Sequence, residues 1–169
     1  MEDMPESPSD PSPNFETQQP GGKFTIKSIY CKDISFETPN SPALFRSEWK
    51  PEIEMQLGTE AREIAHNEYE VVLTVTVTTK LNGNTAFLAE VKYAGLFDIA
   101  GLTSDELGRT LGSQCPGILF PYTRELVSGL VVRGGFPPLV LAPVNFEALY
   151  ENHLHKQSGD QPAAPESQS

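Results

Sequence analysis

The sequence predicts an α+β fold, in which a four-stranded antiparallel sheet is followed by helices packed on one face. Apolar and polar residues alternate through residues 24–93, and helical spacing replaces the alternation after Gly101. Between two alternating stretches stands Asn82-Gly83, a hairpin signal because both residues tolerate positive φ angles. Ionised side chains share one face of the strands, so we expect water on that side of the sheet.

The four strands are expected, in chain order, over residues 24–36, 49–57, 69–79 and 85–93. The first strand keeps its alternation only if a bulge lies near Ser28. The second contains Pro51, which has no N–H to donate to a neighbour, and this favours an edge of the sheet. The segment between them, Thr38–Pro42, holds two prolines and is expected to be a loop.

The first two helices are expected after Thr103, whose side chain can form a capping box with Glu106. The first helix is predicted to stop near Gly112, and Pro116 suits the first turn of the second. Pro121 would remove a hydrogen bond inside that second helix, which predicts either a kink or a late start.

The end of the second helix is expected at Gly134-Gly135, because glycine readily adopts the conformation that closes helices. An apolar loop with two prolines should follow over residues 136–142. A last helix is predicted to begin at Pro143 or Asn145, with its apolar side chains gathered along one side.

Both ends of the chain are expected to be disordered. Residues 1–22 contain five acidic residues, five prolines and no Lys or Arg, a composition that buries too little apolar surface to order a segment. Residues 157–169 are polar and proline-containing as well. The folded domain is therefore predicted to span residues 23–156.

Composition narrows the class of function. The 169 residues leave room for one domain with tails. A formal net charge of −11 argues against nucleic acid as a partner and permits a basic protein partner. No apolar run approaches the roughly 20 residues that cross a bilayer, so no direct membrane insertion is expected, and the N-terminus does not resemble a secretory signal. We expect the two cysteines to be reduced and the protein to be cytoplasmic.

Enzyme signatures such as a nucleophile elbow or a phosphate-binding loop are missing from the sequence, and we expect no catalytic residues, metal or cofactor. Cys115 precedes a predicted helix start, which could lower its pKa, but a buried structural thiol is the favoured interpretation. Asp33 and Glu37 could form an acid pair, yet no base or oxyanion donor accompanies them. His153 and His155 are two positions apart on a predicted helix and cannot share a metal.

The chain carries more apolar residues than one small domain is expected to bury. The predicted edge strand has an apolar face formed by Trp49, Ile53, Met55 and Leu57. Two interpretations stay open: these residues form contacts between copies of the chain, or they line an exposed groove for unfolded segments. Met55 would suit such a groove, because thioethers adapt to varied partners.

Four motifs resemble the SecB family of bacterial protein-export chaperones. They are Lys32-Asp33-Ile34-Ser35-Phe36-Glu37, Tyr69-Glu70-Val71-Val72-Leu73, Cys115-Pro116 with Ile118-Leu119-Phe120-Pro121-Tyr122, and Leu141-Ala142-Pro143-Val144-Asn145-Phe146. The resemblance runs over residues 24–150. It implies a homotetramer, assembled as a dimer of dimers, with its helices between two eight-stranded sheets. It also implies an ATP-independent chaperone that holds unfolded preproteins competent for translocation and delivers them to the SecA motor.

The resemblance further implies three groups of site residues. A flat acidic surface for the basic zinc-binding tail of SecA would contain Asp33, Glu37, Leu88 and Glu90. The client-binding groove would be lined by Trp49, Ile53, Met55, Leu57, Phe146, Leu149 and Tyr150. The tetramer interface would be supported, from the opposite face of the sheet, by Ala89, Val91 and Tyr93.

Three alternatives stay open from the sequence. The nearest is a SecB-like chaperone for a dedicated cytoplasmic client such as an antitoxin. The second is an enzyme that uses Cys115 or the Asp33 and Glu37 pair. The third is a structural oligomer without a client.

Overall fold

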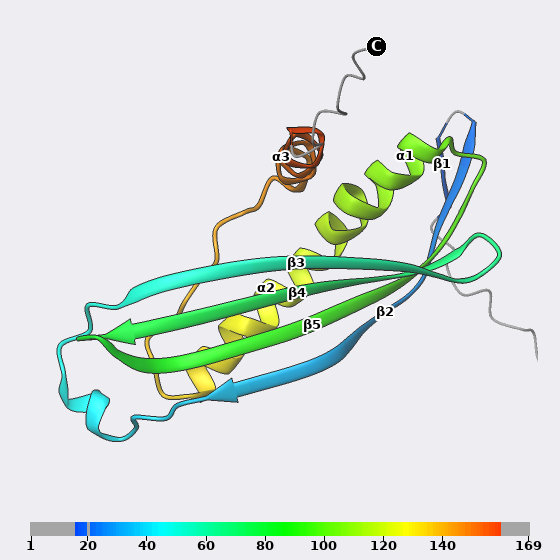
Figure 1. The fold of residues 1–169 in the computed structure, drawn as a ribbon. Helices are drawn as coiled ribbons and strands as arrows, with labels where there is room; N and C mark the ends of the chain where they lie inside the picture. The colour runs from blue at the N-terminus through cyan, green and yellow to red at the C-terminus, as the bar shows by residue number, and fades with distance from the viewer. Residues whose placement is uncertain (1–15, 20, 160–169) are drawn as a thin grey trace, which may run out of the picture.

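The computed structural model describes residues 16–19 and 21–159, which form one sheet with a layer of helices on one face (Figure 1). All strand pairs are antiparallel, in the order β1-β2-β5-β4-β3. The strands are β1 (Glu16–Gln19), β2 (Gly22–Glu37), β3 (Glu52–Ala65), β4 (Glu68–Leu81) and β5 (Asn84–Ala100). The helices are α1 (Ser104–Arg109), α2 (Cys115–Arg133) and α3 (Phe146–Gly159), with a 3₁₀ turn at Ala43–Arg46 and a π turn at Thr110–Gln114.

The four predicted strands are all present, and several of their details are confirmed. β2 is bulged next to Ser28, and β3 lies at an edge of the sheet. The turn at Asn82-Gly83 has φ angles of 52° and 78°, as a two-residue hairpin requires. A second bulge in β2, between Cys31 and Asp33, was not predicted. Side chains on both faces are exposed there, so no burial pattern marks the change of register.

Two strands run further than the alternation indicated. β3 continues to Ala65 through small and polar residues that interrupt the apolar pattern, and β5 continues past Ala94-Gly95 to Ala100, with Phe97 and Ile99 buried. An additional hairpin joins β3 to β4 and places Asn67 at a positive φ of 61°, which asparagine tolerates. These extensions are held by the backbone ladder, which requires no particular side chain.

The ends of the fold also differ from the expected domain boundaries. Residues 16–19 form β1 and pair with the start of β2, so the segment predicted to be disordered through residue 22 is ordered in part. Backbone pairing explains this, because it satisfies N–H and C=O groups without apolar side chains. α3 reaches Gly159, beyond the expected end of the domain. The predictions of disorder for residues 1–15 and 160–169 lie outside the described residues.

The capping box at the start of the helices is confirmed. The N–H of Glu106 donates to the hydroxyl of Thr103 (3.3 Å), whose own N–H donates to the Glu106 carboxylate (2.8 Å). The predicted stop near Gly112 is wrong, because α1, the π turn and α2 follow one another without a break. The N–H of Cys115 bonds to a carbonyl five residues back instead of four. The next residue, Pro116, has no N–H, and the wider turn accommodates this missing donor.

The later helix boundaries agree with the sequence. Gly134 caps α2, and Gly135 follows with a φ of 86°. Asn145 caps α3 by accepting the N–H of Ala148 at 3.0 Å. Pro121 lies inside α2, which begins six residues earlier at its own first turn, so a late start of this helix is wrong.

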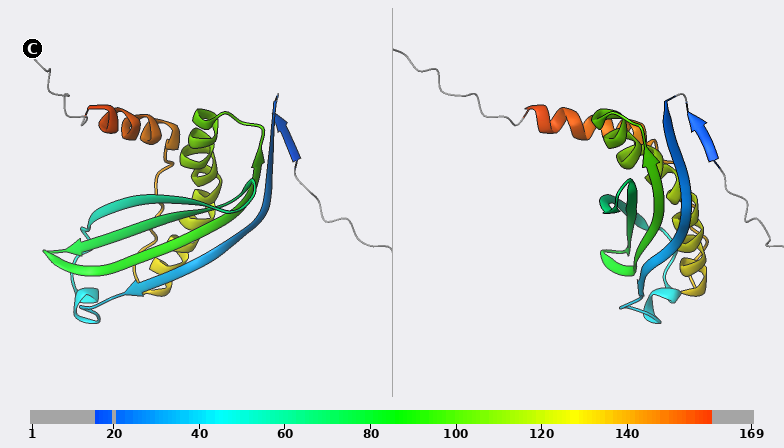
Figure 2. Two further views of the ribbon diagram at one scale, coloured as in Figure 1. Left: turned by 45° about the vertical axis from the view of Figure 1, so that its right-hand side comes forward. Right: turned by 90° about the vertical axis from the view of Figure 1, so that its right-hand side faces the viewer.

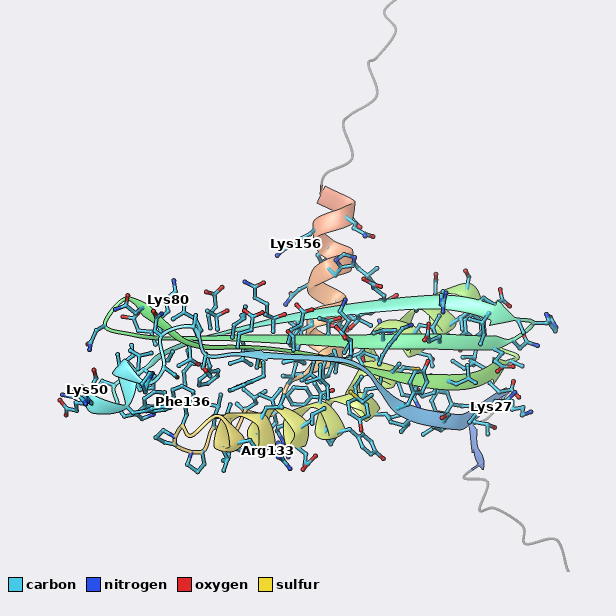
Figure 3. The ribbon with its side chains drawn as sticks, turned by 90° about the horizontal axis from the view of Figure 1, so that it is seen from below. Lys27, Lys50, Lys80, Arg133, Phe136 and Lys156 are labelled. Atoms are coloured by element: carbon cyan, nitrogen blue, oxygen red, sulfur yellow. The ribbon has the colours of Figure 1, made fainter. Side chains whose placement is uncertain are left out.

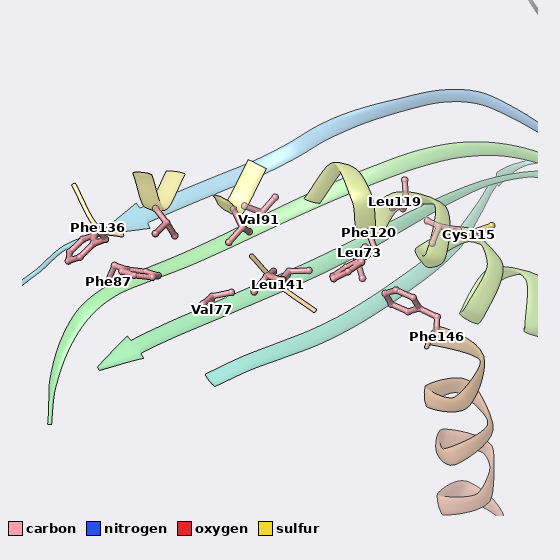
Figure 4. Close-up of a cluster of buried hydrophobic side chains, with 14 of the residues drawn as sticks. Leu73, Val77, Phe87, Val91, Cys115, Leu119, Phe120, Phe136, Leu141 and Phe146 are labelled. Atoms are coloured by element: carbon pink, nitrogen blue, oxygen red, sulfur yellow. The ribbon is translucent and has the colours of Figure 1, made fainter. Parts of the chain in front are cut away.

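The core lies between the sheet and α2, as Figure 4 shows; Figure 2 shows α2 against one face of the sheet, and Figure 3 presents the two layers edge-on. α2 packs across β5 and β4, whose inward residues are the alternating apolar set predicted from the sequence. The fully buried side chains include Leu73, Val75, Val77, Phe87, Val91, Leu119, Val127 and Val131. The loop after α2 closes the same face with Phe136 and Leu141.

On the opposite face, one buried carboxylate ties three strands together. Glu70 of β4 accepts hydrogen bonds from Tyr30 (2.5 Å) and Lys32 (2.6 Å) of β2 and from Arg62 (2.7 Å) of β3. These donors, with the Lys32 hydrogen bond foremost, lower the pKa of Glu70 to about 2. The hydrogen bond to Glu70 also raises the pKa of the Tyr30 phenol.

The Glu70 contacts should make part of the stability depend on pH. Their contribution is complete above the ordinary glutamate pKa of 4.5 and is lost as the pH falls toward about 2. We expect Glu70→Gln to lower the free energy of unfolding at neutral pH by roughly 1–3 kcal/mol, and by less near pH 3. Urea unfolding at fixed subunit concentration measures this.

A matched control for this variant is Glu52→Gln, which removes an exposed carboxylate from the same face. This control should leave the pH profile of stability unchanged. The same loss of stability in both variants would contradict the assigned role of Glu70.

Candidate functional site

An open apolar cleft of about 650 Å³ lies between the edge strand β3 and helix α3. Met55 and Leu57 contribute from β3, Leu149 and Tyr150 from α3, and Leu111 from the π turn. The remaining lining residues are Thr59, Ala61, Gly108, Gly112, Phe146 and His153. The structure thus brings together five of the seven residues expected in a client-binding groove.

The cleft exists because α2 does not cover β3. α2 packs on β5 and β4, whereas β3 meets the helix layer chiefly through the π turn. Apolar side chains on the two walls therefore stay accessible, with Met55 36% exposed and Leu149 46% exposed. Apolar side chains on facing walls gain free energy when an apolar segment enters between them and displaces water.

Phe146, the first residue of α3, anchors this helix at the inner end of the cleft. Its side chain is buried, and its ring meets the ring of Phe120 edge-on at a centroid distance of 5.6 Å. The next turns of α3 carry largely exposed side chains and stand away from the rest of the helix layer (Figure 3). One wall of the cleft is therefore a strand in a sheet, and the other is a helix anchored mainly at its start.

The other two expected groove residues, Trp49 and Ile53, do not line the cleft. Trp49 precedes β3 and places its ring 5.6 Å from that of Phe136, which also contacts Phe45 at 5.3 Å and Phe87 at 5.1 Å. Ile53 is exposed at the start of β3, between Trp49 and Met55 along the chain. The expected groove thus consists of two apolar regions connected along β3.

The four residues expected to face SecA lie together on the outer face of the sheet, away from the helices. Glu37 stands opposite Leu88 in the register of β2 and β5, and Glu90 stands two pairs further along, opposite Ser35. Asp33 pairs with Lys92 in the same register. Glu90 accepts a hydrogen bond from Thr76 (3.2 Å), and nothing helical covers this face in the described residues.

The charges on the outer face are divided into two regions. Toward the β3–β4 hairpin, the carboxylates that have a lysine within 3.2 Å are Glu68, Glu70 and Asp98. Within the described part of the chain, Asp33, Glu37 and Glu90 have no cation at salt-bridge distance. Carboxylates without a counter-ion on an open face attract a basic partner over about a Debye length.

The residues expected to support a tetramer interface point inward, toward the helices. Ala89 and Val91 are fully buried within the subunit, so they have no surface available for direct contact with another copy. Tyr93 stacks on Tyr122 of α2 at a centroid distance of 5.7 Å. Tyr122 is itself 47% exposed, so Tyr93 lies beneath an aromatic ring on the outer surface of α2.

The thiol considered as a nucleophile is unsuited to that role. Cys115 is fully buried, and burial raises the pKa of its thiol to about 12. This supports the structural interpretation of Cys115. Among residues 16–19 and 21–159, no three His, Cys, Asp or Glu side chains are grouped to hold a metal. Within the same residues, every helix is too short or too polar to span a bilayer.

Comparison with known proteins identifies the family. The family model for the preprotein translocase subunit SecB matches residues 16–157. The protein-export protein SecB of Methylococcus capsulatus is 51% identical over 151 residues, which cover 89% of this chain and 97% of that protein. The protein-export protein SecB of Hahella chejuensis is 52% identical over 143 residues, which cover 85% of this chain and 90% of that protein.

Among solved structures, the SecB-like chaperone of Mycobacterium tuberculosis, in complex with a peptide from an antitoxin, has the same fold. The TM-score is 0.60 at 20% sequence identity, with 72% of this chain and 90% of that chain covered. This identity supports a shared fold alone. The family model matches residues 16–157, and the two relatives are 51% and 52% identical to the chain. The chain therefore belongs to the SecB family.

Proposed function

We propose that this protein is an ATP-independent chaperone that binds unfolded precursors of exported proteins and keeps them competent for translocation. The observation that carries the proposal is the open apolar cleft between β3 and α3. Unfolded precursors expose apolar and aromatic segments that such a cleft would bury. Relatives 51% and 52% identical to the chain are named protein-export proteins, which supports the same class of client.

Holding a precursor in this way would rely on many weak contacts. The cleft is open on one side, so each client segment would gain only part of the energy of full burial. Met55 would adapt to segments of different shape. Several clefts on one tetramer would act together through effective concentration. Slowly folding precursors would be captured preferentially, because they expose their apolar segments for longer.

Delivery to the SecA motor would use the opposite face of the sheet. We assign docking of the basic tail of SecA to the acidic patch of Asp33, Glu37, Leu88 and Glu90. This patch lies on β2 and β5, whereas the cleft lies at the β3 edge. Client and motor could therefore bind at the same time, which a direct transfer requires. We place this activity in the cytoplasm.

A chaperone dedicated to one cytoplasmic client, such as an antitoxin, remains the nearest rival. The antitoxin peptide belongs to the complex of the M. tuberculosis neighbour, which is 20% identical to this chain. Profiling the clients that copurify with the protein separates the two functions. Many exported precursors would support the proposal, and one abundant antitoxin would support the rival.

Capture of an unfolded precursor is the first test. Refolding of a denatured, slowly folding precursor should stop at near-stoichiometric tetramer without ATP. The double variant Met55→Ala with Leu57→Ala should weaken capture roughly tenfold, since each truncation removes about 0.5–1 kcal/mol of apolar contact. Refolding rates over a range of chaperone concentrations measure both effects.

The matched control for the cleft is Ile64→Ala, which truncates another exposed apolar side chain of β3 outside the cleft. It should capture the precursor like the wild type. If the wild type leaves refolding unchanged, the proposed function is wrong. If the double variant captures as well as Ile64→Ala does, the cleft is not the client site.

Docking of SecA should depend on the acidic patch and not on the cleft. Asp33→Lys or Glu90→Lys should weaken SecA binding at least several-fold at low salt, because each variant turns attraction into repulsion. Client capture should stay unchanged. Glu48→Lys makes the same change of charge in the loop before β3 and serves as the control. Equal loss of SecA binding and client capture in folded variants would argue against two separate surfaces.

Assembly into a homotetramer is proposed to involve the exposed face of α2. Tyr122→Ala should shift the protein to smaller species in sedimentation velocity, and Tyr93→Ala should do so less strongly by removing the ring beneath Tyr122. Circular dichroism should show an unchanged fold for Tyr122→Ala. Val140→Ala truncates an exposed apolar side chain of the loop after α2 and is the control. A stable tetramer in both tyrosine variants would contradict this interface.

A further inference from the structure

We propose that Arg109 is a positioning residue for client binding: it holds Tyr150 on a glycine seat and thereby fixes α3 as the outer wall of the cleft. The inference rests on the proposed binding of clients in the cleft. Its starting point is the weak attachment of α3. The principal contact of α3 with another element is the one with the π turn.

The glycine seat is the surface formed by Gly108 and Gly112, which have no Cβ atoms and let the Tyr150 ring approach closely. A Cβ atom on Gly112 would lie 2.5 Å from Cδ2 of the Tyr150 ring. A Cβ atom on Gly108 would lie 2.9 Å from the Tyr150 hydroxyl oxygen. Any larger residue at position 112 would therefore push the ring outward. Because Tyr150 belongs to α3, the helix would move with it.

Arg109 also binds this part of α3, through ion pairs and a cation–π contact. Its guanidinium pairs with the carboxylates of Glu147 and Glu151, the latter at 3.4 Å. Its Cζ also lies 5.7 Å from the centroid of the Tyr150 ring, within the range of a cation–π contact. Ser113 of the π turn donates a further hydrogen bond to Glu147 (2.7 Å). One arginine side chain thus contacts α3 at three points along successive turns.

With Tyr150 seated, α3 acts as a wall of the cleft and not as a cover. Met55 and Leu149 are exposed while these contacts are in place, so the cleft is already open. Loosening α3 would remove a prearranged surface, and an entering client would have to order that surface again. The effect should appear mainly as faster client dissociation.

The ion pairs of Arg109 also predict that client binding depends on salt, even for a client without charges. Arg109, Glu147 and Glu151 are each about half exposed, so dissolved salt screens their attraction. Binding of a client segment without charges should therefore weaken with salt in the wild type. In Arg109→Gln this dependence should be reduced, because the ion pairs are gone.

The test compares client binding with the position of Tyr150. The probe is a reduced and carboxymethylated small protein, which stays unfolded. Arg109→Gln should raise its Kd roughly 3–10-fold, mostly through dissociation, and Arg109→Lys should recover part of the loss. Gly112→Ala should have a similar effect without any change of charge. The control Gly117→Ala adds the same methyl group in α2, where the nearest atom, on Phe146, is 3.9 Å away.

The position of Tyr150 is followed by fluorine NMR after the tyrosines are replaced with 3-fluorotyrosine. The chain has five tyrosines. Tyr150→Phe identifies the Tyr150 resonance. In Arg109→Gln and Gly112→Ala, but not in Gly117→Ala, this resonance should move toward the position of a solvent-exposed ring.

Two results would overturn the inference. The first is an unmoved Tyr150 resonance in both variants. The second is a moved resonance without a higher Kd: an unchanged Kd would mean that the position of α3 does not affect binding, and a lower Kd would make α3 a cover. If the wild type fails to bind the probe, the proposed chaperone function falls as well, whereas the other two results leave that function intact.

Discussion

The rest of the structure depends on one constraint, which is that the helix layer is narrower than the sheet. α2 packs on β5 and β4 and buries most of their inward side chains, but β3 lies beyond its reach. Apolar residues of β3 such as Met55 therefore face α3 and water. Covering these side chains would raise the free energy of unfolding by about 1–2 kcal/mol for each one buried. The same cover would eliminate the cleft, so the open client site that we propose comes with a lower stability of the edge strand.

The outer face of the sheet shows a second division, made by its charges. Around Glu70, three donors satisfy one carboxylate: Arg62 comes from the adjacent strand β3, and Tyr30 and Lys32 reach across β5 from β2. Near Glu90, the carboxylates have no cation at salt-bridge distance in the described residues, which leaves their charge available to the proposed basic partner. The same residue type thus stabilises the fold in one region and attracts basic groups in another. The difference comes from the cations that other strands of the sheet place beside each carboxylate.

The parts of the fold that the sequence predicted are those with one buried and one exposed face. Alternation located β4 and β5 and placed Leu88 and Glu90 outward, because burial on one face imposes a period of two. The second half of β3 could not be predicted, since its small and polar residues have no such period. Thr59 and Ala61 of the cleft were missed for this reason.

The largest error, at Gly112, shows what a local pattern cannot convey. Glycine favours helix ends, and this predicted a stop. In the folded chain its missing Cβ instead makes room for the ring of Tyr150, almost 40 positions away in the sequence. Arg109 was missed likewise, because its partners lie on α3. Contacts between distant segments decide these roles. The cleft consequently joins a wall fixed by the sheet to a wall held by a few contacts at the π turn, so the position of α3 depends on residues that no local pattern marks.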